Sequence, residues 1–310
     1  VSMGEHHKVE IFDKNGTLIS TIGSSASSEQ GKFHHNYGVA YDSYGTLYIS
    51  ERQNHRVQSF DQNGTYTNTI GSFGTPNVDP YDFAITEEGT YLVADTQGDR
   101  ILEFDENGSV VQSISARGNQ DGKVNDPRSV AVHDGIIFVA DGSNHRVQAF
   151  DRNGTYLFKF GGVGSGNGQF NQPYGLLISE ADNELYVADR HNHRIQVFDL
   201  EGNFVRKFGS YGNLEGQYNQ PVDLDFNDDG SLAVLSHGNS RLISVTTSGQ
   251  YLSHWATNGG SMHVANLNNG LMGVCWSRYI GVYENNGFRV KHWNKNGYSY
   301  SSISGLNDGS

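Results

Sequence analysis

The sequence predicts an all-β fold, a β-propeller built from four-stranded antiparallel blades. Three observations support this prediction: a short phrase recurs along the chain, most copies end in a tight turn, and two further strand patterns precede each complete copy. The composition agrees, because 39 glycines and 12% aromatic residues in 310 positions favour strands and turns over helices or disorder. A net charge of −13 disfavours nucleic acid and anionic lipid surfaces as partners.

The recurring phrase alternates apolar and polar residues and ends at a glycine. Copies read KVEIFDKNG (8–16), RVQSFDQNG (56–64), RILEFDENG (100–108), RVQAFDRNG (146–154) and RIQVFDLEG (194–202), with degenerate copies RLISVTTSG (241–249) and YIGVYENNG (279–287). The period of about 45 residues is typical of a four-stranded propeller blade. Alternation with a period of two, followed by an Asn-Gly turn, predicts that each copy is the first half of a hairpin.

Two more predicted strands precede the phrase in each repeat. They are clearest in PYGLLIS (173–179) and LYVAD (185–189), and matching runs lie at 37–51, 80–95, 127–141 and 221–235. Four strands joined by short turns form a sheet that cannot bury its faces alone. Blades stacked around an axis bury them, which is why the repeats predict a propeller.

The number of blades depends on how the chain ends are aligned. Segment 298–310 resembles an inner strand and segment 1–12 resembles its continuation, so their pairing predicts a seventh blade that closes the ring. Six blades is the alternative, with FRVKHWNKNG (288–297) aligned to the phrase. In both cases residues 1–310 form one domain.

The phrase Asn-His-Arg-[Val/Ile]-Gln-x-Phe-Asp, at 54–61, 144–151 and 192–199, resembles the NHL repeat. The following pattern FGGVGSGNGQF (160–170) is also similar to that family. The resemblance covers nearly the whole chain and is specific from 37 to 218. It implies a propeller, usually of six blades, and no single activity. Family members act as protein- or RNA-binding modules, as extracellular sensor domains and, in one branch, as a metal-dependent amidating lyase.

A polar constellation also repeats, with Asp141, His145 and Arg146 in one copy and the same residue types at 189–194 in the next. A single active site does not need repeated copies. We therefore expect a structural role, in which the carboxylate satisfies turn amides and the basic side chain covers the strand ends. Arg206, on a predicted outer strand, is expected to be solvated.

The predicted binding site lies where the inner strands begin, at one mouth of the central channel. Side chains there differ from blade to blade, as a ligand site requires, whereas a structural role repeats. Aromatic side chains would supply contact area and Arg128 would hold an anionic group. The alternative is a water-filled channel with polar walls. The candidate residues are Tyr37, Tyr81, Asp82, Arg128, Tyr174, Asp223 and His263.

These observations favour a non-catalytic platform that binds a protein segment or small ligand at the channel rim. Two alternatives stay open: a metal-dependent lyase or hydrolase with its site at the channel mouth, and a module that binds single-stranded RNA. Asp82, Asp223 and His263 are the residues that could hold a divalent metal in the channel. The several histidines that the lyase branch implies are not found at the other blade starts, so we expect no cofactor.

A single cysteine, Cys275, excludes an intrachain disulfide. Four Asn-x-Ser/Thr sequons lie in the predicted Asn-Gly turns, where turn chemistry explains them, at Asn15, Asn63, Asn107 and Asn153. They would carry glycans only in a secreted eukaryotic protein. We find no membrane or lipidation motif and expect a soluble monomer or a module of a larger protein, in a cytoplasmic or extracellular compartment.

Overall fold

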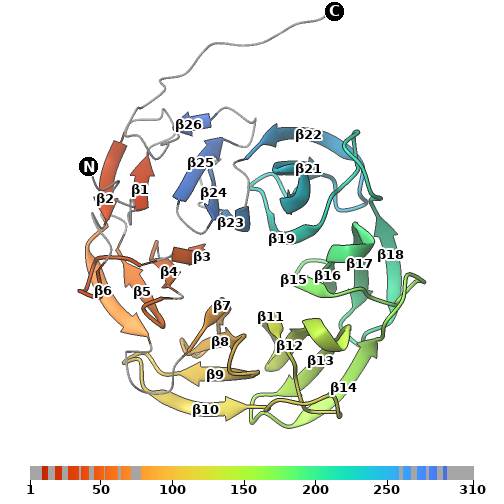
Figure 1. Ribbon diagram of the computed structural model, residues 1–310, viewed down its shortest axis with the longest axis horizontal. Helices are drawn as coiled ribbons and strands as arrows, with labels where there is room; N and C mark the ends of the chain where they lie inside the picture. Colours follow the sequence, from red (N-terminus) through yellow and green to blue (C-terminus); the bar gives the residue numbers. More distant parts are fainter. Residues whose placement is uncertain are drawn as a thin grey trace, which may run out of the picture.

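The computed structural model describes residues 9–12, 18–22, 27–34, 36–41, 45–51, 53–61, 64–70, 78–257, 261–266, 271–276, 279–284 and 289–291. These residues form six four-stranded antiparallel sheets arranged around a central axis (Figure 1). The chain is therefore a β-propeller of four-stranded blades, as its repeats predict. We number the blades 1 to 6 in chain order.

Each blade runs from an inner strand at the axis to an outer strand at the periphery (Figure 1). Blade 1 contains β3 (Asn36–Tyr41), β4 (Leu47–Glu51), β5 (Arg56–Phe60) and β6 (Tyr66–Ile70). Blade 2 contains β7 (Pro80–Ile85), β8 (Tyr91–Asp95), β9 (Arg100–Phe104) and β10 (Val110–Ile114). Blade 3 contains β11 (Pro127–His133), β12 (Ile136–Asp141), β13 (Arg146–Asp151) and β14 (Tyr156–Gly161).

The other three blades follow the same order. Blade 4 contains β15 (Pro173–Ser179), β16 (Glu184–Asp189), β17 (Arg194–Asp199) and β18 (Phe204–Phe208). Blade 5 contains β19 (Pro221–Phe226), β20 (Leu232–Ser236), β21 (Arg241–Val245) and β22 (Tyr251–Ala256). Blade 6 contains β23 (Ser261–Asn266), β24 (Leu271–Trp276), β25 (Tyr279–Glu284) and β26 (Arg289–Lys291). Three short 3-10 helices follow second strands: η1 (Gly142–Asn144), η2 (Arg190–Asn192) and η3 (His237–Asn239).

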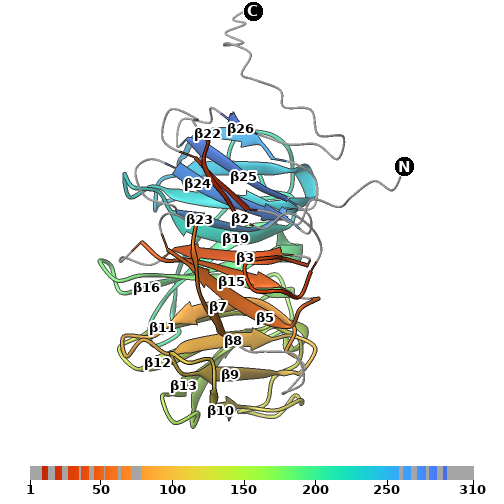
Figure 2. The same cartoon turned by 90° about the vertical axis from the view of Figure 1, so that its left-hand side faces the viewer.

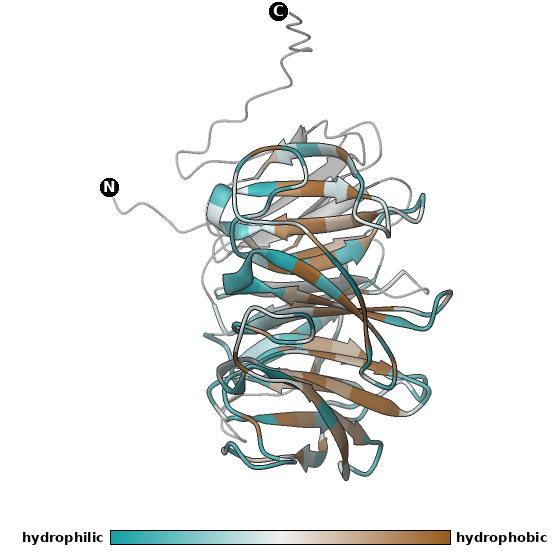
Figure 3. Ribbon diagram, turned by 90° about the vertical axis from the view of Figure 1, so that its right-hand side faces the viewer, coloured by the Kyte–Doolittle hydropathy of each residue, from teal (hydrophilic) through white to brown (hydrophobic). Residues whose placement is uncertain are grey.

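The apolar faces of the blades are buried against neighbouring blades. Phe138 and Val147 of blade 3 belong to one core cluster with Leu176, Val187 and Phe198 of blade 4. Figure 3 shows apolar residues along the strands and polar residues in many of the loops at their ends. The core therefore lies in the seams between blades, and burial in these seams is what favours the ring.

Six blades close the ring, so the prediction of seven is wrong and the six-blade alternative agrees with the described residues. β23 of blade 6 contacts β3 of blade 1, and Ala265 of β23 shares a core cluster with Leu47 and Ile49 of β4. The count of seven came from joining segments 298–310 and 1–12 into one further blade. A two-stranded sheet of β1 (Val9–Phe12) and β2 (Leu18–Ile22) has no inner strands of its own among the described residues, and β1 contacts β25 (Figures 1 and 2). The predicted closing strand at 298–310 lies outside the described residues.

The strand register defines two opposite faces of the ring. In blade 3, Pro127 pairs with Asp141 at one edge, and His133 pairs with Ile136 at the other. The first edge carries the starts of the inner strands and the 3-10 helices, and we call it the mouth face. The second edge carries the hairpin turns, and we call it the turn face. Within the part of the chain that the structure describes, we find no helix whose length and apolar character would let it cross a membrane.

Candidate functional site

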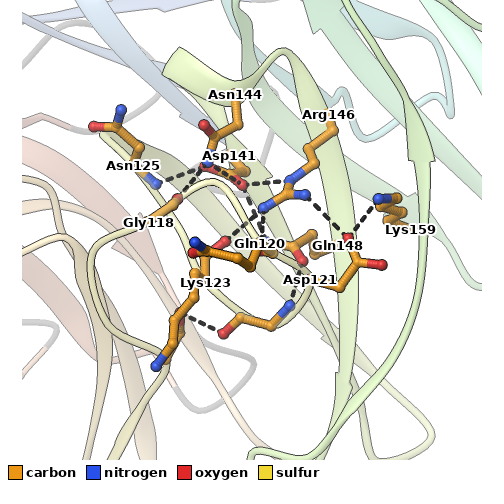
Figure 4. Close-up of polar contacts among 12 residues, drawn as sticks. Gly118, Gln120, Asp121, Lys123, Asn125, Asp141, Asn144, Arg146, Gln148 and Lys159 are labelled. Carbon is orange, nitrogen blue, oxygen red and sulfur yellow. Dashed lines mark hydrogen bonds and ion pairs between the residues drawn. The ribbon is translucent and has the colours of Figure 1, made fainter.

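The repeated aspartate is a buried structural acceptor, as its repetition predicts. Asp141 Oδ1 accepts hydrogen bonds from Asn125 N at 2.7 Å and from Asn144 Nδ2 at 2.9 Å (Figure 4). Its Oδ2 accepts from Arg146 Nε at 2.7 Å and from Gln148 Nε2 at 3.0 Å. The same set of bonds recurs in blade 4 around its own aspartate.

The arginine and histidine of this phrase hold the connections between blades. Arg146 Nη2 donates to the carbonyl oxygens of Gln120 and Lys123, both at 2.7 Å, in the loop that joins blades 2 and 3. His145, with a left-handed φ of 55°, accepts a hydrogen bond at Nδ1 from Gln172 N at 3.0 Å, just before blade 4 begins. These contacts support a structural role for Asp141, His145 and Arg146.

Each inner strand begins with an irregular register, which brings two consecutive side chains toward the channel. The shift lies between Pro127 and Ser129 in β11 and between Pro221 and Asp223 in β19, and the other inner strands show it too. In such a bulge two residues of one strand oppose one residue of its partner, and the side chains are re-aimed. The predicted ring therefore divides into two groups. Each member of the first group is the first residue after the start of its inner strand, and each member of the second group is the next residue.

Three side chains from blades 2, 3 and 4 meet at the mouth. Tyr81 and Tyr174 lie edge to face with ring centroids 5.5 Å apart, and their hydroxyl groups are hydrogen-bonded. The Arg128 guanidinium lies 4.8 Å from the ring centroid of Tyr81 and 5.1 Å from that of Tyr174. Its Nη2 donates to Asp126 Oδ2 at 2.6 Å. Cation–π contacts of this kind favour a fixed guanidinium position.

A second guanidinium, that of Arg190 in η2, lies over the same tyrosine. Its Cζ is 4.8 Å from the Tyr174 ring centroid. Its Nη1 and Nη2 donate to Gln172 Oε1 and Gln220 Oε1, each at the long distance of 3.3 Å. Its Nε is buried without a hydrogen-bond partner, and the described residues place no carboxylate within 4.0 Å of this guanidinium. The hydrogen-bond acceptors of the Arg190 guanidinium among the described residues are thus two neutral amide oxygens.

The second group consists of Asp82, Asp223 and His263. His263 Nδ1 lies 3.4 Å from Asp223 Oδ2, which also accepts a hydrogen bond from Val264 N at 2.8 Å. Asp82 Oδ2 accepts from Ser129 Oγ at 2.5 Å. Burial raises the pKa of Asp82 to about 6; the charge of His263 opposes this shift, and that of Asp223 adds to it. Burial pulls the pKa of His263 down, but the hydrogen bond and charge of Asp223 outweigh it, so that pKa is raised.

The two groups touch, because the His263 ring meets Tyr81 with centroids 5.3 Å apart. The structure therefore brings together six of the seven candidate residues, and the side chain of Tyr37 lies outside the described residues. The structure also shows that the tyrosines of blades 2 and 4 are more buried than a binding rim requires. Tyr81 and Tyr174 are only 1% and 3% exposed, so they fill the channel at this level and do not line an open rim.

Arg190 is the functional candidate that the sequence analysis missed. It lies between the repeated aspartate of blade 4 and the Asn-His-Arg phrase at 192–199, and the predicted ring drew only on the starts of the inner strands. One signal could have drawn attention to it: the residue after the repeated acidic position varies from blade to blade, and in blades 1 to 4 it is Arg52, Thr96, Gly142 and Arg190. Arg206 is a second correction, since it is half-buried and its Nη2 donates to Glu184 Oε2 at 2.7 Å rather than being solvated.

A metal site at Asp82, Asp223 and His263 does not fit the described residues. Among them, no group of three or more His, Cys, Asp or Glu side chains is arranged to hold a metal ion. The carboxylates are instead used by neighbouring protein donors, as the bonds from Ser129 Oγ and Val264 N show. We therefore derive no chemistry through a metal at this position.

Solved structures with a similar fold include several enzymes. A streptogramin B lyase has a TM-score of 0.64 and 15% identity over 87% of this chain and 84% of its own. A gluconolactonase from Xanthomonas campestris has a TM-score of 0.63 and 16% identity over 81% and 86%. A virginiamycin B lyase from Staphylococcus aureus has a TM-score of 0.59 and 15% identity over 81% and 84%. At these identities the likeness shows the fold alone.

The family comparison agrees with the six described four-stranded sheets. None of the curated proteins compared with the sequence matches it. A model of the family DUF5128, described as a 6-bladed beta-propeller, matches residues 114–194 and 175–270. Together these matches span 114–270, just over half of the 310 residues. This chain therefore belongs to the 6-bladed beta-propeller family DUF5128.

Proposed function

We propose that the chain is an NHL-type propeller that acts as a non-catalytic binding module, and that its mouth binds an anionic group of a small ligand or protein segment. One observation carries the proposal. Arg190 is fixed against Tyr174 with only long hydrogen bonds to amide oxygens and a buried Nε that has no partner. A carboxylate or phosphate offers the acceptor pair that a guanidinium fork binds best.

Arg128 supports the same function from the neighbouring blade. Its guanidinium shares the Tyr174 ring with Arg190, and its Nη1 donates to the Tyr174 hydroxyl at 3.3 Å. Its charge is partly compensated by Asp126, which leaves Arg190 as the stronger attraction for an anion. Asp82 and Asp223 would repel a second anionic group, so we expect the other end of the ligand to be cationic or rich in hydroxyl groups.

The test is calorimetric titration of citrate and of inorganic phosphate into the protein at low ionic strength. We expect saturable binding of at least one of them. Arg190→Gln should weaken it by about tenfold or more, since a charge-assisted pair is lost. The matched control is Lys207→Gln, which removes an exposed charge from β18. Equal weakening by both variants would show a response to net charge alone and contradict the proposal.

Tyr174 needs a milder substitution than alanine. Because Tyr174 is buried and packs on Tyr81, Tyr174→Ala would test the fold together with the site. Tyr174→Phe keeps the ring beneath both guanidinium groups and removes the hydroxyl that Arg128 contacts. We expect Tyr174→Phe to bind the anion with an affinity closer to that of the wild type than Arg190→Gln does.

Two other functions remain to be tested against this one. The enzyme alternative is favoured only by the names of structural neighbours, a lyase and a gluconolactonase. Measuring the metal content of the purified protein tests it, because a stoichiometric metal would support a metal-dependent enzyme. Single-stranded RNA is tested by titration at several salt concentrations, since binding through phosphates weakens steeply as salt rises.

A further inference from the structure

A cavity lies on the turn face, at the seam between blades 3 and 4. It has a volume of about 460 Å³ and is lined by Ile136, Phe138 and Phe158 of blade 3 and by Leu200 and Glu201 of blade 4, among others. Phe138 and Phe158 meet with ring centroids 6.4 Å apart. A cavity of this size falls within the usual range for small-molecule sites.

The neighbouring seams are closed by a side-chain hydrogen bond that this seam lacks. At the seam between blades 2 and 3, Gln112 Nε2 donates to the carbonyl oxygen of Arg152 at 2.7 Å. At the seam between blades 4 and 5, Arg206 Nη2 donates to the carbonyl oxygen of Thr247 at 3.0 Å. Phe158 occupies the equivalent position of β14 and has no donor to offer.

Charged side chains also fill the neighbouring seams. At the seam between blades 2 and 3, Glu103 accepts hydrogen bonds from Arg152 at 2.8 Å and Gln112 at 2.6 Å. At the seam between blades 4 and 5, Arg206 Nη2 bonds to Glu184 Oε2 at 2.7 Å and to the Tyr186 hydroxyl at 2.8 Å.

The equivalent positions at the seam between blades 3 and 4 are apolar. Leu200 stands where blade 3 has Arg152, and Ile136 stands where blade 4 has Glu184. Polar side chains that bond across the seam recur at both flanking seams. At the seam between blades 3 and 4 they are replaced by apolar side chains that line the cavity. The departure from the repeat and the cavity thus coincide at one position of the ring.

The rim of the cavity is acidic. Glu201 is exposed, and the Asp134 side chain is 80% exposed with His133 Nε2 at 3.6 Å. The carbonyl of Leu200, whose equivalents in blades 3 and 5 accept a side-chain hydrogen bond, is available as an acceptor for a ligand because Phe158 cannot donate. Acidic groups and a carbonyl next to an apolar cavity complement a cation carried on an apolar body.

We infer that this seam cavity is a binding site for a small organic cation, with an aromatic or branched aliphatic body between Phe158 and Leu200 and an ammonium group at the acidic rim. The site is independent of the mouth, because it lies on the opposite face of the ring. It needs no occupant at Arg190, so either proposal can fail without the other.

The test uses tryptamine as the probe and indole-3-propionate as its anionic counterpart, each titrated into the whole chain by calorimetry. We expect saturable tryptamine binding and weaker indole-3-propionate binding. Leu200→Arg, which restores the residue type found in blade 3, should fill the cavity and weaken tryptamine by about tenfold or more. Thr247→Arg, which adds the same charge at the equivalent turn of blade 5, should leave the affinity unchanged.

A second variant guards against a folding defect in Leu200→Arg. Phe158→Gln restores the donor used at the seam between blades 2 and 3 and should also weaken tryptamine binding, with folding of each variant checked by urea unfolding. Absence of saturable tryptamine binding to the wild type, or unchanged affinity in the folded variants, would overturn the inference. Indole-3-propionate binding as tight as tryptamine would overturn the cationic class of ligand.

Discussion

Asp141→Ala tests the structural interpretation of the repeated phrase most directly. The Asp141 side chain is fully buried and accepts hydrogen bonds from one backbone amide and three side chains. Its main partner, Arg146, is only 7% exposed, so the substitution removes the buried carboxylate from a buried guanidinium and leaves it only a half-exposed one. Removing one partner of such a pair costs about 3–5 kcal/mol in the free energy of unfolding. We expect a loss in this range, measured by urea unfolding.

Two matched variants separate this effect from a general loss of charge. Asp121→Ala removes a 48% exposed carboxylate that lies 3.3 Å from another nitrogen of Arg146, and it should cost far less because solvent screens that pair. Asp141→Asn keeps an acceptor oxygen and should fall between the two. The reasoning is refuted if Asp141→Ala unfolds at the same urea concentration as Asp121→Ala. It is also refuted if citrate binding at the mouth is lost while stability is unchanged.

Three further predictions follow from single contacts. Because burial raises the pKa of Asp82 to about 6, its contribution to the free energy of unfolding is present at low pH and is lost as the pH rises from about 4 to 6. Asp82→Asn should flatten the plot of unfolding free energy against pH over this range, and an unchanged slope would contradict the prediction. Gly175→Ala should lower the free energy of unfolding by about 1–3 kcal/mol in thermal unfolding, because the added Cβ would lie 2.8 Å from a carbonyl oxygen of β19. Gly166→Ala should lower it less, because its Cβ would meet only a flexible glutamine amide. Tyr218→Phe should stabilise the chain by about 1 kcal/mol in urea unfolding, because the buried hydroxyl has no partner and Phe170 occupies the equivalent position; destabilisation would show an unseen partner.

The repeats predicted most of the fold because each blade is a local unit. Alternation in phrases such as RVQAFDRNG placed β13 and its turn, and the Pro-initiated runs placed the inner strands β11 and β15. The blade number could not be read in the same way. The blade number depends on which segments from the two ends of the chain meet in space. β23 of blade 6 contacts β3 of blade 1 directly, and neither strand contains a copy of the recurring phrase.

The candidate site was predicted by position but not in its geometry. We predicted Tyr81 and Asp82 as equivalent members of one ring from the sequence. The bulge instead places Tyr81 with the tyrosine and arginine side chains and Asp82 in the neighbouring acidic group. We expected open aromatic side chains, but Tyr81 and Tyr174 reach across the channel and bury each other. Arg190 was missed because the sequence analysis considered only the starts of the inner strands, whereas Arg190 reaches Tyr174 from η2, which follows the second strand of blade 4. Such long-range contacts have no signature in a single repeat.

Departure from the repeat is therefore a useful marker of function only when a second physical property accompanies it. Tyr218 departs from Phe170 and carries an unsatisfied hydroxyl, but it is fully enclosed and offers nothing to a ligand. Arg190 departs from Gly142 of blade 3, although blade 1 also has an arginine at this position, and it has an unsatisfied, charged group at the mouth, where a solute can reach its partly exposed side chain. Leu200 departs from Arg152 and borders an unfilled volume on the turn face. An unsatisfied hydrogen-bonding group or an unfilled cavity, at a position that a solute can reach, distinguishes Arg190 and Leu200 from ordinary sequence variation among the blades.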